Sequence, residues 1–197
     1  MSESDKVSWD KRYADGSYHG REEPSALLKA WIDNLPKGRA LDLACGTGRN
    51  GLFLAEHGYS VDGLDISDVA LKKAQESAEQ RSLEVNWVQA DFDNPDLPQN
   101  TYDVIVNCRF MDRDLIPRMK DALKDGGYIL FEHHLLSNDP SVNVGGPSSY
   151  WRLRPNELLH QFLDLRVISY DEFVAPESDG RTAALVWLVA SKGDAGF

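Results

Sequence analysis

The segment RALDLACGTGRNG, residues 39–51, is the strongest indication of the fold class, because a short β-type run passes directly into a glycine-rich loop. Gly46, Gly48 and Gly51 have the GxGxxG spacing, in which glycines permit a tight turn and a close approach of backbone to a ligand. Apolar residues resume after the loop and stop at Gly58, a residue type that commonly ends helices. The segment therefore predicts a strand, a ligand-binding type of loop and a helix.

On both sides of this segment, β-type runs alternate with helical stretches, a pattern typical of a mostly parallel sheet covered on both faces. The predicted strands before the last two are residues 39–44, 59–64, 85–89, 102–107 and 128–132. Helices are predicted at residues 24–35, 52–58, 68–80 and 155–163, and one more is predicted to end near Lys124. Ser67 should cap the helix Asp68–Gln80, and residues 125–127 should form a turn. Two final runs, 166–173 and 182–190, are joined by a turn-rich link and should pair antiparallel. The predicted fold class is an α/β, doubly wound, mostly parallel sheet ending in an antiparallel β-hairpin.

The composition indicates one globular domain without nucleic-acid or membrane partners. The 197 residues are expected to form a single domain, with an N-terminal helical lid region at 1–37 and a core at 38–197. Asp and Glu outnumber Lys and Arg by 32 to 21, and this net charge of −11 disfavours polyanionic partners. The sequence has no membrane-length apolar run and no apolar stretch for a signal peptide. Cys45 and Cys108 are too few for a disulfide framework, so we expect a cytoplasmic protein, either a monomer or a homodimer.

The residues around the glycine loop leave two classes of ligand open. Asp65 follows Gly46 by nineteen residues, the place of the acid that binds ribose in NAD domains, so an NAD-linked oxidoreductase is one interpretation. Three features favour a cationic adenosine ligand instead. Asp42 places an additional negative charge near the loop, which favours a cationic ligand over a pyrophosphate. The Asp91 carboxylate can accept a hydrogen bond from an exocyclic amine, and Phe92 can pack on a base. The terminal hairpin is a feature that an NAD domain does not need.

The motifs LDLACGTGRN, VDGLDIS, VQADFDN, YDVIVN and LKDGGYILFE, taken in order, resemble those of class I S-adenosylmethionine-dependent methyltransferases. The resemblance spans residues 39–132 and implies a seven-stranded Rossmann-like sheet, S-adenosylmethionine as the cofactor and S-adenosylhomocysteine as its product. The runs GRN (48–50), WDKRY (9–13) and GGP (145–147) look more narrowly like the tellurite-resistance and thiopurine branch. The resemblance implies an enzyme that transfers a methyl group to a small molecule by in-line displacement.

The same resemblance implies cofactor contacts. Asp65 would bind the ribose hydroxyls, Asp91 would accept from the adenine amine, and Asn107 would face the methionine portion. Asp42 would orient the loop and the methionine amino group, and Asn50 would cap the following helix. The other implied contacts belong to the loop or lie beside the adenine: Ala44, Cys45, Gly46, Thr47, Gly48, Ile66 and Phe92. The residues alone allow ordinary explanations as well, since an Asp after a strand often stabilises a turn and an apolar residue there often belongs to the core.

The acceptor side has weaker signals. In-line displacement depends on positioning more than on an obligatory base, so no catalytic residue is assigned, and His134 and Tyr13 are the only candidates. Trp9 and Tyr13 would fold over the cofactor as a lid, and residues 137–149 with Tyr150-Trp151 would cover the acceptor. Further acceptor-side candidates, chosen as aromatic or basic residues, are Arg109, Phe110, His133 and Arg181. No metal site is expected, because adjacent strand residues such as His133 and His134 point to opposite faces.

Several acceptor classes stay open. The run NCRF after the fourth predicted strand, residues 107–110, is unlike the NPPY-type run of enzymes that methylate adenine or glutamine amino groups. Tellurite-resistance-type enzymes are expected to use a His-Arg pair near the final hairpin, and here Arg181 has no histidine beside it. The remaining acceptors are a thiol, an amine, a carboxylate or hydroxyl, and a chalcogen oxyanion. A non-catalytic protein that binds S-adenosylmethionine is a further alternative.

Overall fold

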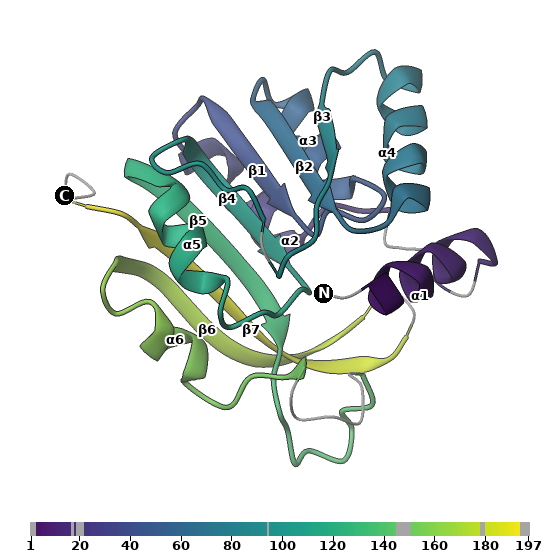
Figure 1. The fold of residues 1–197 in the computed structure, drawn as a ribbon. Helices are drawn as coiled ribbons and strands as arrows, with labels where there is room; N and C mark the ends of the chain where they lie inside the picture. The colour runs from purple at the N-terminus through teal and green to yellow at the C-terminus, as the bar shows by residue number, and fades with distance from the viewer. Residues whose placement is uncertain are drawn as a thin grey trace.

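A seven-stranded sheet forms the centre of the computed structural model, which describes residues 3–16, 18, 22–93, 95–144, 151–177 and 180–193. The strands are β1 (Arg39–Leu43), β2 (Ser60–Asp65), β3 (Asn86–Gln89), β4 (Tyr102–Cys108), β5 (Leu123–His134), β6 (Arg166–Pro176) and β7 (Thr182–Ser191). Their order in space is β3-β2-β1-β4-β5-β7-β6 (Figure 1). Strands β3 to β5 in this order pair in parallel, and β7 pairs antiparallel with both β5 and β6. The predicted doubly wound sheet with a terminal hairpin is confirmed.

One strand boundary differs from the prediction. β5 begins at Leu123, and the residues expected to form a turn, 125–127, lie inside the strand as an irregularity. Gly126 has a φ of 78°, a left-handed conformation that glycine adopts readily, and its N–H donates to the Lys192 carbonyl at 2.8 Å. The two glycines suggested that the strand begins only after a turn. In the structure the backbone bends there but keeps a hydrogen-bonding partner, so the strand continues.

Helices cover both faces of the sheet and create two cores. They are α1 (Glu3–Ala14), α2 (Ala26–Trp31), the 3-10 helix η1 (Ile32–Asn34), α3 (Arg49–Glu56), α4 (Asp68–Gln80), α5 (Ile116–Ala122) and α6 (Glu157–Gln161). Alternate side chains of a strand point to opposite faces. Val104 and Val106 of β4 therefore join the core under α2 and α3, while Ile105 joins the core under α5 and α6. Among the described residues, no helix is long and apolar enough to span a membrane.

The N-terminal region divides into two parts. Instead of one helix at 24–35, the chain forms α2 followed by η1, and both pack into the core, with Leu28 fully buried. α1 lies apart from this core, beyond the ends of β1 and β2 and beside α4 (Figure 1). Only α1 is thus placed as a lid would be, and the division of the chain at residue 37 stays a prediction.

The start of α4 connects the sheet to α1. The predicted Ser67 cap is confirmed, because its Oγ accepts from the Ala70 N–H at 3.1 Å. The same hydroxyl donates to Asp10 of α1 at 2.6 Å, and Lys6 of α1 lies 2.8 Å from Asp68. These contacts hold α1 over the carboxyl ends of the parallel strands. β1 and β4 are neighbours, and the strands that follow them in the chain, β2 and β5, lie to opposite sides of this pair. In parallel sheets of this kind, ligands bind in the crevice between two such neighbouring strands, at their carboxyl ends.

Candidate functional site

The glycine loop, residues 44–48, turns sharply between β1 and α3. Ala44, Gly46 and Gly48 have φ values of 52°, 56° and 84°, in the left-handed region that favours glycine. The Cys45 N–H donates to the Leu64 carbonyl at 2.9 Å, which fastens the loop to β2. The loop is therefore a rigid stretch of backbone at the carboxyl edge of the sheet.

Two buried carboxylates position this loop. Asp42 of β1 is 1% exposed and accepts from the Gly51 N–H in α3 at 2.8 Å. Burial raises the pKa of Asp42 to about 7. Asp65 of β2 accepts from the Gly46 N–H at 2.8 Å and from the Ser67 N–H at 2.9 Å, and burial raises its pKa as well. Each carboxylate thus orients backbone N–H groups at the start of a helix or in the loop.

Trp87 of β3, for which no role was predicted, explains two of the motif's three glycines. A Cβ on Gly48 would lie 2.5 Å from the Trp87 ring, and one on Gly51 would lie 3.1 Å from it. A Cβ on Gly63 of β2 would lie only 2.3 Å from the same ring. These glycines make room for a tryptophan below the loop. The one signal in the sequence was a large aromatic residue in a short strand, NWVQ, that begins and ends with a polar residue.

Aromatic residues of the N-terminal region cover the loop from above. A Cβ on Gly46 would lie 2.7 Å from the Tyr13 hydroxyl oxygen. Trp9, Tyr13 and Tyr18 form a cluster with ring centroids 5.3 to 6.0 Å apart. Tyr13 is 6% exposed, and burial together with the Asp65 charge raises its pKa, so its hydroxyl is protonated at neutral pH. The predicted lid residues Trp9 and Tyr13 do lie over the loop.

Two small cavities remain between this cluster and the loop, and they collect most of the predicted cofactor contacts. One, of about 50 Å³, is lined by Ala44, Cys45, Gly46, Thr47 and Asn50 of the loop region, together with Tyr13, Tyr18, Arg49, Cys108 and Arg109. The other, of about 90 Å³, lies beside Asp65, Ile66, Phe92 and Phe110, under Trp9 and Tyr13.

Four predicted contacts lie outside these two cavities. Asp42 lies in β1, before the loop, and Gly48 is the last loop residue, beside the Trp87 ring. Asp91 is exposed, and its carboxylate accepts from the Asp93 N–H at 3.0 Å. Asn107 is fully buried and donates to the Phe110 carbonyl at 2.9 Å. Asn107 therefore shapes the turn after β4 from beneath.

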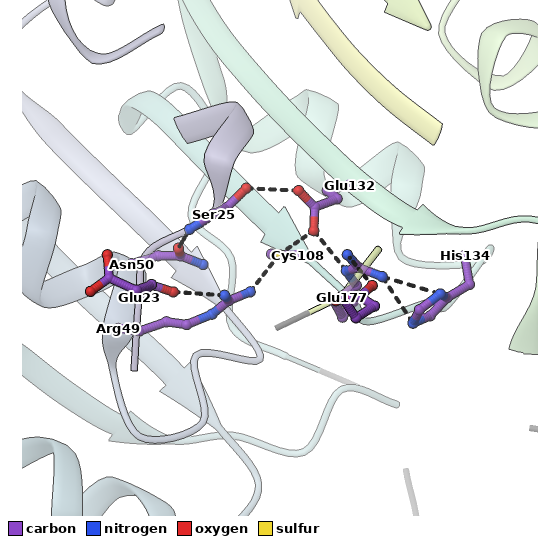
Figure 2. A network of polar contacts seen from close by, with 9 residues as sticks. Glu23, Ser25, Arg49, Asn50, Cys108, Glu132, His134 and Glu177 are labelled. Carbon is purple, nitrogen blue, oxygen red and sulfur yellow. Dashed lines mark hydrogen bonds and ion pairs between the residues drawn. The ribbon is translucent and has the colours of Figure 1, made fainter. Parts of the chain in front are cut away.

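A second polar site centres on Arg109, which follows β4. Arg109 has a φ of 67°, an uncommon conformation for a residue with a side chain, and such strain often marks functional sites. Its guanidinium lies 2.6 Å from Glu132, 3.0 Å from Glu177 and 3.0 Å from the His134 ring (Figure 2). Burial would raise the pKa of Glu132, but Arg109 and the Ser25 hydroxyl outweigh it, and the pKa is lowered. Glu132 is therefore ionised at neutral pH.

Hydrogen bonds extend this network to the glycine loop. Ser25 donates its hydroxyl to Glu132 at 2.9 Å and its N–H to the Asn50 side chain at 2.9 Å (Figure 2). Asn50 thus binds Ser25 and does not cap α3, whose cap residue is Gly48. Arg49 donates to the Cys108 sulfur at 2.9 Å. Burial and the Glu132 charge raise the pKa of Cys108 to about 12, so this thiol is not a nucleophile at neutral pH.

A cavity of about 620 Å³ opens beside the network. Arg49 and Arg109 line it and also line the 50 Å³ cavity over the loop, so the two spaces adjoin. Its apolar wall includes Phe173 of β6 and Trp187 of β7, whose rings meet edge to face with centroids 4.8 Å apart. This cavity has the size and the mixed lining of a small-molecule site.

The other acceptor-side candidates are placed as follows. His133 is buried with its Nε2 2.6 Å from the Trp151 carbonyl, and burial lowers its pKa to about 4. His134 contacts Arg109, and Arg181 is exposed in the turn between β6 and β7. Residues 145–149 of the predicted covering loop, including the GGP run, and Tyr150 lie outside the described residues. Within the described ranges, no group of three or more His, Cys, Asp or Glu side chains is arranged to hold a metal ion.

Comparisons with known proteins agree with this geometry. The sequence family described as a methyltransferase domain matches residues 40–127. The "Probable S-adenosyl-L-methionine-dependent methyltransferase TehB" of Haemophilus influenzae is 27% identical over 171 residues, 83% of this chain and 56% of that protein. The crystal structure of TehB from Haemophilus influenzae has a TM-score of 0.73 at 25% identity and covers 93% of this chain and 67% of that one. Glycine N-methyltransferase of Homo sapiens is 32% identical over 175 residues, 68% of this chain and 59% of that protein.

Residues 40–127 therefore match the methyltransferase-domain family, and the chain is similar in sequence and in fold to class I S-adenosylmethionine-dependent methyltransferases. Within this class its sequence and its fold are similar to TehB, which confirms the predicted resemblance to the tellurite-resistance branch. The chain spans 56% and 59% of the lengths of the two curated relatives named above.

Proposed function

We propose that this chain binds S-adenosylmethionine over the glycine loop and transfers its methyl group to a small molecule held in the 620 Å³ cavity. The observation that carries the proposal is that Arg49 and Arg109 line both the loop cavity and the large cavity. A cofactor over the loop and an acceptor in the cavity would meet at these residues. In-line transfer requires such a meeting, because its rate depends on holding two reactants in line.

The residues around the loop suit the cofactor. Asp65 accepts from the backbone N–H groups of Gly46 and Ser67 and also interacts with that of Ile66. A carboxylate has about four acceptor sites, so it can also accept from a ribose hydroxyl. Ile66 and Phe92 line the 90 Å³ cavity as apolar partners for the adenine ring. Asp42 acts as a positioning residue through the Gly51 N–H. The loop residues Ala44, Cys45, Gly46, Thr47 and Gly48 would surround the methionine part, while the roles of Asp91 and Asn107 stay predictions.

Cofactor entry requires α1 to move. Small-molecule sites are roughly 300 Å³ or larger, whereas the cavities over the loop measure about 50 and 90 Å³. Tyr13 lines both, so its displacement would join them into one larger site. The contacts of Lys6 with Asp68 and of Asp10 with Ser67 hold α1 in its covering position. In this proposal α1 is a lid that opens by breaking them.

When bound, S-adenosylmethionine supplies an electrophilic methyl group on a positively charged sulfur. The chain positions the acceptor opposite that sulfur and keeps water away. Tyr13 and Cys108 hold their protons at neutral pH, and a ring nitrogen of His134 lies 3.0 Å from the Arg109 guanidinium. These surroundings favour catalysis by positioning over catalysis by a general base.

The proposal specifies a small soluble acceptor rather than a nucleic acid, because the net charge of −11 repels phosphate backbones. A reducing cytoplasm is part of the proposal, since both Cys45 and Cys108 are free thiols. The oligomeric state proposed is a monomer or a homodimer.

Calorimetric titration of the cofactor-free protein with S-adenosylmethionine, S-adenosylhomocysteine and NADH tests the cofactor assignment. We expect binding of both adenosyl ligands and none of NADH. Binding of NADH alone would support an oxidoreductase and overturn the proposal. A second assay follows S-adenosylhomocysteine release over a panel of small acceptors, and cofactor binding without turnover would support the non-catalytic alternative.

A further inference from the structure

The charged wall of the 620 Å³ cavity carries more carboxylates than cations. Among the described residues that line it, the acids are Glu22, Glu23, Glu132 and Glu177, and the bases are Arg49 and Arg109. Glu22 and Glu23 are exposed, whereas the side chains of Glu132 and Glu177 are only 6% and 8% exposed. The inner wall therefore places two poorly solvated carboxylates beside one arginine.

Both arginines already bind groups of the protein. The Arg109 guanidinium contacts Glu132, Glu177 and His134. Figure 2 labels these three partners. Arg49 donates to the Glu23 carbonyl at 2.8 Å and to the Cys108 sulfur at 2.9 Å. An oxyanion is usually held by a guanidinium that presents two parallel N–H groups to it. An oxyanion in this cavity would therefore meet an Arg109 that two carboxylates already neutralise, and an Arg49 whose N–H groups are bound to a carbonyl and a thiol.

The rest of the cavity wall is largely apolar, and it begins beside Glu132, because Trp187 of β7 is the direct cross-strand neighbour of Glu132. Phe173 and Trp187 meet edge to face there, and Leu185, Ala175 and Pro176 of the hairpin complete the surface. Such a wall suits a ring or a branched aliphatic group, because apolar area is favourably removed from water. The cavity as a whole fits a ligand with an apolar body and a head that tolerates, or carries, positive charge.

We propose that the methyl acceptor is a primary or secondary amine on an apolar, ring-sized body, an inference that rests on the proposed function. The bound ammonium first gives a proton to solvent, because a protonated amine has no lone pair. The amine nitrogen then attacks with its lone pair, the new N–C bond forms as the C–S bond breaks, and that electron pair stays on sulfur. Positive charge passes from the sulfur to the nitrogen, and the methylated ammonium then gives a proton to solvent. Glu132 and Glu177 stabilise the charge as it arrives on nitrogen, which is where preorganised anions lower a barrier.

The experiment compares head groups on a constant body. Protein saturated with S-adenosylhomocysteine is titrated with benzylamine, benzyl mercaptan, benzyl alcohol and phenylacetate, and the series is repeated with butyl compounds. The same compounds, together with tellurite, are assayed for turnover with S-adenosylmethionine. We expect the amine to bind about tenfold or more tightly than the carboxylate on each body, and amines to give turnover.

A charge variant and a matched control sharpen the test. Glu177→Gln should weaken amine binding about tenfold, strengthen carboxylate binding and leave the affinity for S-adenosylhomocysteine unchanged. Glu76→Gln removes an exposed charge on α4, far from the cavity, and should change none of these. Should Glu177→Gln not fold, Glu23→Gln at the cavity mouth should give the same change in preference, with a smaller magnitude.

The failures of the two proposals are distinguishable. Preferred binding or turnover of the thiol, the carboxylate or tellurite would overturn the amine inference and leave the methyltransferase proposal standing. The same conclusion would follow if no head group bound to the protein loaded with S-adenosylhomocysteine. If S-adenosylhomocysteine itself did not bind, the proposed function would fail, and the amine inference would fail with it.

Discussion

The glycine loop and the Arg109 network lie at the same edge of the sheet, but they are built in opposite ways. The loop uses backbone N–H groups that two buried carboxylates hold in place, Asp42 through Gly51 and Asp65 through Gly46. The Arg109 network uses side chains from four separate segments of the chain, in which one arginine faces two carboxylates. Figure 2 shows Ser25, Glu132, His134 and Glu177 of this network. A backbone site suits one invariant ligand, whereas a side-chain site can change its preference with single substitutions.

The largest expected effect comes from breaking the network. Glu132→Ala leaves Arg109 with one carboxylate partner instead of two in a buried position. We expect the free energy of unfolding to fall by about 3 kcal/mol, the lower end for a broken buried ion pair, because Glu177 still compensates part of the charge. Urea unfolding measures the change. Glu132→Gln, which keeps an oxygen for Ser25, is the control and should cost less. A loss under about 1 kcal/mol for Glu132→Ala would show that the pair is solvated.

The matching change in the loop should affect binding more than stability. Asp65→Ala removes the carboxylate proposed for the ribose hydroxyls, and cofactor binding should weaken by about 1.5–3 kcal/mol, as for lost hydrogen bonds to a charged group. Calorimetry with S-adenosylhomocysteine measures the loss. Asp65→Asn keeps an acceptor for the Gly46 N–H and separates the ribose role from loop positioning. Unchanged affinity in a folded Asp65→Ala protein would overturn the ribose assignment.

The contrast between the two regions also explains which of them the sequence could predict. The contacts of the loop join residues 9 and 19 positions apart, so a short motif with a fixed spacing contains them. The succession of strands and helices along the chain and the terminal hairpin were predictable for a similar reason, since each β-type run and each turn is local. The Ser25–Glu132 contact joins residues 107 positions apart, and no local pattern brings Ser25, Arg109, Glu132 and Glu177 together. Of these four residues, only Arg109 was predicted, from its place after the fourth strand.

Trp87 marks the limit of motif reasoning within the loop region itself. The GxGxxG spacing is usually explained by the ligand, yet Gly48 and Gly51 are also required by the ring of a residue on a neighbouring strand. That packing depends on the register of β2 and β3, in which Gly63 is paired with Trp87. Register between strands is a property of the folded sheet, so the sequence motif alone did not reveal it.

A substitution at Gly63 tests this packing. Gly63→Ala places a Cβ 2.3 Å from the Trp87 ring, and Gly63 lies in a regular strand without a left-handed φ, so the cost is steric. We expect a loss of about 1–3 kcal/mol in the free energy of unfolding, as for overpacked cores. The double variant Gly63→Ala/Trp87→Leu should lose less than the sum of the single changes, measured by a double-mutant cycle. Strict additivity would mean that the two residues do not meet.

The smallest expected effect is a dependence on pH with opposite signs in the two regions. Burial raises the pKa of Asp42 to about 7, so between about pH 4 and 7 the native state keeps a proton that the unfolded chain has released. Asp42 therefore makes stability fall as pH rises through this range. The pKa of Glu132 is lowered instead, so its contribution is present above its unfolded pKa and is lost as pH falls.

Asp42→Asn isolates the contribution of Asp42 to the pH dependence of stability. The amide oxygen can still accept from the Gly51 N–H, but the amide does not titrate in this pH range. From about pH 5 to about pH 7.5 the variant should gain stability relative to the parent by more than about 1.4 kcal/mol, the equivalent of one pKa unit. Glu132→Gln should show no such gain. Denaturant unfolding of the cofactor-free proteins at both pH values measures each difference. Equal slopes for Asp42→Asn and its parent would mean that Asp42 ionises normally. The expected slope would mean that the loop retains a destabilising carboxylate, as a site for a cationic ligand requires.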